Sequence, residues 1–184
     1  MAIGVFNPSI PTANDIMLGE GIVYKNYGEV GESIMGATRG GSKLDIDRPI
    51  KEINFDGAYG QTQGLRRYEK FIPKLVINFL KLTYSNFIHG MPVTVSDGSD
   101  LDGTYKEITF DLDINASDVL TNLTFVGQKH DGKACLIKLK NALNIDSINL
   151  DFKEKDELTA EMTYTGFYSA STPSVPPLEI WDYK

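Results

Sequence analysis

The chain has 184 residues, which is enough for one domain with a substantial core and short for two. Its net charge is -7 and its pI is about 4.8, so sequence-independent binding to a phosphate backbone is disfavoured. The N-terminal residues lack the basic and apolar regions of a signal peptide, and no apolar stretch approaches transmembrane length. We expect a protein that is made in the cytoplasm and does not enter a membrane.

The order of apolar and turn residues predicts many short strands. In most apolar runs, β-branched and aromatic residues alternate with polar ones, which is typical of strands with one covered face. Glycine, proline and asparagine separate the runs, as they do in turns. Asp131-Gly132 and residues 154–157 each connect two runs and predict antiparallel hairpins. The expected strands are 21–27, 44–55 with a break at Pro49, 71–82, 93–95, 105–114, 120–128, 134–140, 147–153 and 158–168.

Little helix is expected between these strands. Thr83 can cap a short helix that runs through Ile88 and ends at Gly90, and residues 141–145 can form one further helical turn. Many strands with one minor helix predict a mainly β fold, a sandwich or barrel, over residues 20–169.

Three segments lie outside this strand pattern. Residues 1–19 are an expected N-terminal arm, residues 170–184 a proline-rich C-terminal arm, and residues 56–70 a long loop that contains glycine and arginine. Because arms and loops of this kind often become ordered on a partner, we expect them to carry contacts between subunits. The expected contact residues are Gly57, Tyr59, Gly60, Gly64, Leu65, Arg66, Arg67, Trp181 and Tyr183.

No motif has the spacing of a catalytic or metal site. The run 36–43 resembles a phosphate-binding loop, but its serine and lysine stand in reverse order and a strand follows it. Residues 97–103 lack both terminal carboxylates of a calcium loop. No cluster around His89 or His130 has metal-ligand spacing, and the single Cys135 lies in an apolar run. We therefore expect a non-enzymatic protein with no cofactor and no metal.

A further pattern covers most of residues 34–169. Its segments are Gly36-Ala-Thr-Arg-Gly-Gly-Ser42, Arg48-Pro-Ile-Lys-Glu-Ile-Asn-Phe-Asp-Gly57, Gly60, Gly64-Leu-Arg66, Cys135-Leu-Ile-Lys-Leu-Lys-Asn-Ala-Leu143, Asn149-Leu-Asp-Phe-Lys-Glu-Lys-Asp156, Tyr164 and Phe167-Tyr168. Together they resemble the major tail tube proteins of phages and prophages of Gram-positive bacteria. The resemblance implies a β-sandwich subunit with a flanking helix. Such subunits close into hexameric rings, which stack into a hollow tube for DNA passage.

The same resemblance implies partners and a location. In that family the long loop between two early strands reaches the neighbouring ring, and here this loop would be residues 56–70. The expected partners are further copies of the chain, together with tape measure, tail terminator and baseplate or tail-tip proteins, and DNA only in passage. The protein would be found in the virion tail after synthesis in the host bacterial cytoplasm. Non-contractile tails, contractile tails and related injection machines all remain open.

Acidic strand faces are candidates for the lining of such a tube. In 105–114, 147–153 and 158–165, polar and apolar residues alternate, so the polar residues share one surface if these strands belong to one sheet. An acidic surface would repel DNA rather than bind it. The same residues could instead face the outer solvent. The expected lining residues are Glu107, Asp111, Asp113, Asp151 and Glu161.

Two other classes of protein remain as alternatives. A β-sandwich binding module, for example a carbohydrate-binding domain or a virion adhesin, would need an exposed aromatic platform. Most aromatic residues here fall within alternating strand patterns, so we expect them in the core. An enzyme is the third class, and no motif supports it. Gel filtration separates the first two classes, because a binding module stays small whereas a tube subunit polymerises.

Overall fold

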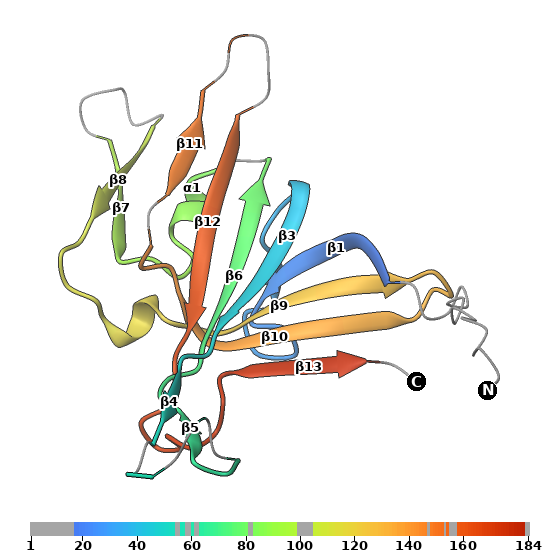
Figure 1. The fold of residues 1–184 in the computed structure, drawn as a ribbon. Coiled ribbons are helices and arrows are strands. Elements are labelled where there is room, and N and C mark those ends of the chain that lie inside the picture. The colour runs from blue at the N-terminus through green and yellow to red at the C-terminus, as the bar shows by residue number, and fades with distance from the viewer. Residues whose placement is uncertain are drawn as a thin grey trace.

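The computed structural model describes residues 17–53, 56–57, 60, 63–80, 83–98, 105–146, 148–152, 154 and 158–182. Strands dominate these ranges and form a curled antiparallel sheet with the shape of half a barrel (Figure 1), which confirms the expected mainly β fold. The strands are β1 (Met17–Lys25), β2 (Ser33–Ile34), β3 (Thr38–Asp47), β4 (Ile50–Glu52), β5 (Arg66–Tyr68), β6 (Ile72–Phe79), β7 (Val93–Asp97), β8 (Lys106–Phe110), β9 (Leu120–Lys129), β10 (Ala134–Leu143), β11 (Asn149–Asp151), β12 (Thr159–Gly166) and β13 (Leu178–Asp182).

The main sheet has nine strands in two parts that meet at a corner. The first part runs β2-β1-β9-β10, with β13 paired to the start of β10, and lies across the molecule in Figure 1. The second part runs β3-β6-β12, with β11 on the far side of β12, and stands upright in the same view. The parts join where Ala142 and Leu143 of β10 pair with Gly166 and Thr165 of β12.

The core lies between the inner faces of the two parts. Strand β6 shows why: its residues alternate strictly between half-buried and buried positions, and the buried side is apolar. β12 alternates in the same way as far as Tyr164 beside it, and β1, β9 and β10 close the opposite side. The buried apolar cluster comprises Val23, Met35, Leu75, Ile77, Phe79, Met91, Leu123, Leu139, Ala142, Ala160, Met162 and Tyr164.

A glycine is required at the corner between the two parts. A Cβ atom added to Gly166 would lie 2.6 Å from Leu139 Cδ1, which is closer than real Cβ contacts come. The absent side chain therefore lets the end of β12 approach β10 and close the corner.

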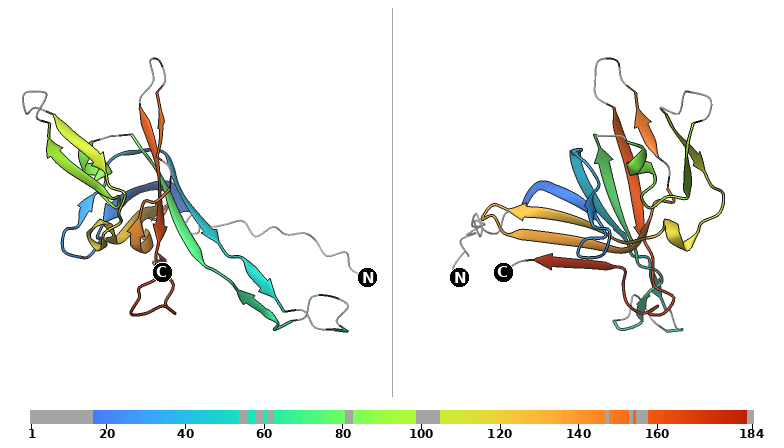
Figure 2. Two further views of the ribbon diagram at one scale, coloured as in Figure 1. Left: turned by 90° about the vertical axis from the view of Figure 1, so that its left-hand side faces the viewer. Right: turned by 180° about the vertical axis from the view of Figure 1, so that it is seen from behind.

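Two antiparallel hairpins project from this body. The β4–β5 hairpin continues the line of β3 and β6 beyond the sheet, and the β7–β8 hairpin forms a separate two-stranded sheet. Figure 2 shows that they extend from opposite ends of the molecule. Between β6 and β7 lies the short helix α1 (Tyr84–Phe87), with Thr83 at its N-cap, and Gly90 follows it at φ +71°. The predicted helix is confirmed, although it ends one residue earlier than expected and the Thr83 side chain makes no capping hydrogen bond.

The sequence predictions succeed for the long strands and fail for shorter features. The break at Pro49 and both predicted hairpins are confirmed. Residues 141–145 are not helical, because β10 continues to Leu143 and Asn141 takes φ +47°. β2 and the start of β3 lie between the expected strands 21–27 and 44–55, where no strand was predicted.

Both expected arms and the expected long loop contain strand. β1 begins at Met17, within the predicted N-terminal arm, while residues 1–16 lie outside the described ranges. β5 occupies the last third of the predicted loop 56–70. The C-terminal segment returns to the sheet as β13, which the proline-rich sequence around it did not suggest.

Candidate interaction surfaces

The β4–β5 hairpin holds most of the predicted contact residues. Ile50 pairs with Tyr68 and Glu52 with Arg66, and the ladder continues through a hydrogen bond from the Ile53 amide to the Leu65 carbonyl at 3.0 Å. Beyond it, Gly57 and Gly64 take φ +96° and +86°, which suits glycine alone. Gly60 lies in the same connection, and Tyr59 is outside the described residues.

The two predicted arginines differ in their surroundings. Arg66 lies across from Glu52, with 3.3 Å between Arg66 Nε and Glu52 Oε1, so it has a carboxylate partner within its own hairpin. Arg67 lies directly opposite Lys51 on the other face. Two like charges at directly opposed strand positions destabilise a hairpin. Among the described residues, neither Lys51 nor Arg67 has an ion-pair partner.

Apolar side chains of the β4–β5 hairpin remain in solvent. Ile50 is 53% exposed, and Tyr68 on the facing strand is 66% exposed. These two side chains form a cross-strand apolar pair that nothing in the described part of the chain covers. The hairpin therefore has one cationic face and one face with an exposed apolar pair.

The β7–β8 hairpin and the segment after it expose a second apolar row. Phe110 ends β8 with 58% of its surface exposed, and Leu112 and Ile114 continue the alternation at 101% and 57%. Phe110 was expected in the core with most of the other aromatic residues, and that expectation is wrong. β8 pairs only with β7 in the described chain, so no facing sheet covers this row.

The same hairpin carries acidic side chains. Asp97 forms an ion pair with Lys106 opposite it, while Glu107 lies on the other face, opposite Ser96. Asp111 accepts a hydrogen bond from the Thr94 hydroxyl at 2.8 Å. These carboxylates and the exposed Asp113 together make the projecting end acidic.

The residues predicted to line a lumen fall on two separate surfaces. Glu161 is exposed on β12 and pairs with Asn149 of β11. Asp151 of β11 pairs with Thr159 of the same strand β12. Glu107 belongs to the separate β7–β8 sheet, and Asp111 and Asp113 lie beyond the end of β8. The premise that all three strands share one sheet is therefore wrong.

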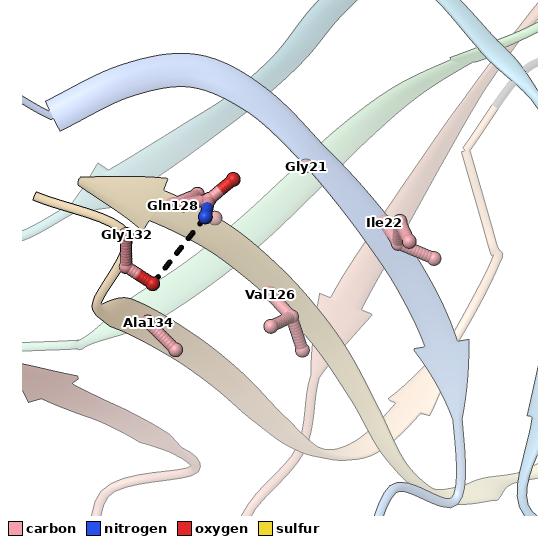
Figure 3. A pocket seen from close by; sticks show the side chains of 7 residues that line it. Gly21, Ile22, Val126, Gln128, Gly132 and Ala134 are labelled. Carbon is pink, nitrogen blue, oxygen red and sulfur yellow. Dashed lines mark hydrogen bonds between the residues drawn. The ribbon is translucent and has the colours of Figure 1, made fainter. Parts of the chain in front are cut away.

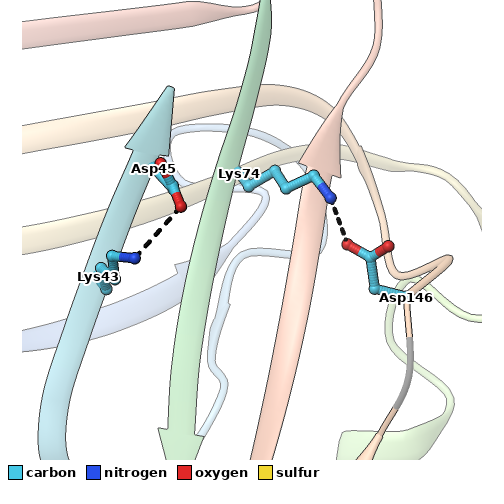
Figure 4. A network of polar contacts seen from close by, with 4 residues as sticks. All are labelled: Lys43, Asp45, Lys74 and Asp146. Atoms are coloured by element: carbon cyan, nitrogen blue, oxygen red, sulfur yellow. Dashed lines mark hydrogen bonds and ion pairs between the residues drawn. The ribbon is translucent and has the colours of Figure 1, made fainter. Parts of the chain in front are cut away.

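The outer face of β3, β6 and β12 is polar with charges of both signs. Lys43 and Asp45 interact on β3 at 3.2 Å, and Lys74 of β6 reaches Asp146 at 2.9 Å (Figure 4). Glu161 lies on the same face, opposite Asn78 of β6. Because the basic groups are paired, this face offers no cluster of free cations to a phosphate backbone.

β13 presents a further exposed strand. Ile180 and Trp181 are 57% and 60% exposed, and in the described chain β13 pairs on one side only, with β10. Trp181 also borders a hollow of about 170 Å³ beside Tyr27. The ammonium of Lys140 bonds to Glu179 and holds the pKa of that carboxyl below its usual range. Tyr183 is outside the described residues.

Two larger hollows lie on the described chain, one lined mostly by glycine and apolar residues and one that also includes Glu69, Lys70 and Lys74. One of about 490 Å³ lies along β1 and β9, and its polar side chain is Gln128, which bonds to the Gly132 carbonyl at 3.3 Å (Figure 3). Another of about 530 Å³ lies at the base of the β4–β5 hairpin, beside Phe71 and Tyr168. Among the described residues no group of three histidine, cysteine or acidic side chains could hold a metal ion. No helix in these ranges is long and apolar enough to span a membrane.

The titratable groups near the core have structural partners. His89 is half-buried, and the Lys25 ammonium lies 3.3 Å from its Nδ1 atom. Burial and that positive charge lower the pKa of His89 to about 4. The buried Tyr164 hydroxyl donates to the His89 carbonyl at 3.2 Å, and burial raises its pKa. Burial also raises the pKa of the Cys135 thiol, which keeps it in the unreactive form.

Comparison with known proteins gives a likeness to solved structures and none to a protein family or a curated protein. No protein-family model matches the chain, and no curated protein matches it. Among the solved structures, the chain is similar to a chain of a particle described as "Virion of native gene transfer agent (GTA) particle". The sequences are 9% identical, the TM-score is 0.40, and the match covers 88% of this chain and 95% of that one.

Proposed function

We propose that the protein is a structural subunit that assembles with copies of itself into stacked rings, which form a hollow tail tube for DNA passage. The observation that carries the proposal is the placement of large exposed apolar side chains on the projecting hairpins, on the segment after β8 and on the edge strand β13. Leu112 at 101%, Tyr68 at 66% and Trp181 at 60% are the clearest cases. Grouped exposure of this kind marks surfaces that meet other proteins.

Open strand edges add to this argument. In the described chain, β3 pairs only with β6 and β13 pairs only with β10, so each leaves a row of backbone groups on its outer side. An open edge is a template for pairing with another chain unless something covers it. Self-assembly covers edges and exposed apolar side chains together.

The tube and its DNA passage are inferred from the sequence resemblance. The resembling segments 36–42 and 48–57 belong to β3 and the projecting β4–β5 hairpin, where contact with a neighbouring ring would occur. The mixed-charge face of β3, β6 and β12, with Glu161, is the candidate lumen wall, since it offers DNA no cationic cluster. Contacts with tape measure, terminator and tail-tip proteins belong to the same proposal, which includes no catalysis.

The first test measures assembly of the purified protein. Gel filtration and negative-stain electron microscopy over a wide concentration range should show rings or tubes whose amount increases with concentration. Tubes with a central channel would support the proposal. A single small species at every concentration would reject self-assembly and favour the alternative of a β-sandwich binding module.

A second test removes the β4–β5 hairpin without cutting the sheet. The Glu69 amide donates to the Pro49 carbonyl at 2.9 Å, so these residues already face each other across the ladder. Replacing residues 50–68 by Asn-Gly should therefore close a short hairpin between them. We expect unchanged strand-type circular dichroism and loss of tubes. Normal tubes from this variant would remove the hairpin from the assembly.

A further inference from the structure

The two projecting hairpins carry opposite charge. Residues 48–70, which include β4 and β5, contain five basic and three acidic side chains. Residues 93–118, which include β7 and β8, contain seven acidic side chains and one basic side chain. The first of these segments therefore has a net charge of +2 in a chain whose net charge is -7, and its strands β4 and β5 form a projecting element.

The positive charge on β4–β5 is held in an unfavourable arrangement. Lys51 and Arg67 lie directly opposite each other, with no carboxylate of the described chain paired to either. An acidic group from outside would relieve that repulsion. Glu107 and Asp113 on the β7–β8 side are exposed, and in the described chain neither has an ion-pair partner.

The apolar residues match as well as the charges. Ile50 and Tyr68 form an exposed pair on one hairpin. Phe110, Leu112 and Ile114 form an exposed row on the other. A contact that joins an apolar centre to charges of opposite sign gives both affinity and a fixed orientation.

These two surfaces cannot meet within one chain. In the left-hand view of Figure 2, β7–β8 lies at the upper left and β4–β5 at the lower right, at opposite extremes of the molecule. Two different surfaces of one subunit that complement each other make a head-to-tail contact, which repeats from copy to copy. The charges and the geometry therefore favour a second copy of this chain as the partner that binds these surfaces.

We propose that the β4–β5 hairpin of one copy docks on the β7–β8 hairpin and residues 110–114 of a second copy. The contact is edge to edge, because the charged and apolar side chains lie on opposite faces of each hairpin. On one side of the joined hairpins Lys51 and Arg67 lie beside Glu107 and Asp113, and on the other side the two exposed apolar groups lie beside each other. The inference rests on the proposed self-assembly and names the surface that receives the hairpin.

The test is a charge swap in the full chain. The first variant combines Lys51→Glu with Arg67→Glu, and the second combines Glu107→Lys with Asp113→Lys. Each should raise the concentration needed for assembly by roughly tenfold or more, because attraction becomes repulsion between like charges. The fourfold variant, with all these changes and the original net charge, should assemble near the original concentration. An equimolar mixture of the first two variants should also assemble, since each supplies the charge that the other lacks.

The outcomes separate this inference from the proposed function. If the original protein and both twofold variants assemble alike, the docking is overturned while self-assembly stands, and the two hairpins are left to other partners. If the twofold variants do not assemble, and neither their mixture nor the fourfold variant regains assembly, the proposed pairing of these charges is overturned. If the original protein never assembles, both proposals fall. Circular dichroism of each variant confirms folding, which exposed substitutions should preserve.

Discussion

Strand β6 and the segment from β8 to Ile114 have the same alternating pattern and opposite surroundings. In β6 the apolar residues Leu75, Ile77 and Phe79 are at most 1% exposed. After β8, Leu112 is 101% exposed and Ile114 57%. Alternation therefore tells which residues share a face, and it does not tell what covers that face.

The difference lies in the neighbours of each strand. β6 lies between β3 and β12, and its inner side chains belong to a cluster that includes Val23 and Leu139 from the other part of the sheet. β8 has β7 on one side and, in the described chain, no other strand. A two-stranded hairpin alone buries too little to be stable in water, so its apolar face needs another surface. Apolar residues of the projecting hairpins are therefore left largely uncovered by the described chain.

The largest effect on stability is expected from a core phenylalanine. Phe79→Ala should lower the free energy of unfolding by about 3–5 kcal/mol, because the side chain is fully buried and leaves a cavity. Phe110→Ala is the matched control on the projecting hairpin. It should cost about 1 kcal/mol or less, because most of that ring is already in water. Urea unfolding at low protein concentration measures both, and equal losses would contradict the division between core and hairpin.

The corner between the two parts of the sheet should tolerate little change. Gly166→Ala would place a methyl group 2.6 Å from Leu139 Cδ1 and 3.3 Å from the Lys140 carbonyl. We expect a loss of about 1–3 kcal/mol, as is usual when a packed core is overfilled. Gly60→Ala is the control, since nothing lies within 4 Å of its added methyl group. Thermal unfolding compares the two, and an unchanged midpoint for Gly166→Ala would show that the corner can open.

The sequence predicts the long paired strands well, because their alternation and turn residues are local signals. It does not predict β5 or β13, which are three and five residues long and lie beside glycine or proline. Pairing partners far along the chain stabilise these short strands, and such pairing leaves no local pattern.

The candidate contact surfaces are only partly visible in the sequence. Arg67 and Trp181 were foreseen as contact residues, and the structure leaves both exposed. Lys51 was missed because its importance comes from the strand register that sets it opposite Arg67. Leu112 was missed because its pattern equals that of a core strand, although the aspartates on both sides of it were a usable signal.

A smaller effect is expected from protonation of His89, which lies between α1 and the start of β7. Its pKa is lowered from 6.5 to about 4 by burial and by Lys25. Between these pH values the unfolded chain binds a proton that the folded chain does not, so stability is full above pH 6.5 and falls as the pH drops to 4. Allowing for the half of the ring that water reaches, we expect this group to cost about 1–2 kcal/mol.

The His89→Gln variant isolates this contribution. Its side-chain oxygen can still accept a hydrogen bond from Lys25, but it does not titrate. Unfolding free energies measured from pH 7 to pH 4 should fall less steeply for the variant than for the original protein. If the unfolding free energies of both proteins fall equally with pH, His89 binds a proton equally well in the folded and unfolded chains.

The smallest effect on unfolding, and a large one on assembly, is expected from Leu112→Ser. The side chain is fully exposed, so the free energy of unfolding of the dilute subunit should change by no more than about 0.5 kcal/mol. If a second copy covers Leu112, the lost burial is worth about 1.5–3 kcal/mol, which raises the concentration needed for assembly by roughly tenfold or more. Val30→Ser is the control, because Val30 is 98% exposed in the turn between β1 and β2, which belongs to neither hairpin, and the change should alter neither quantity. Light scattering against concentration measures assembly. If Leu112→Ser and the original protein give equal curves, Leu112 lies outside every contact between copies. If Leu112→Ser assembles less readily and Val30→Ser does not, another subunit covers the apolar row, which no strand of the described chain covers.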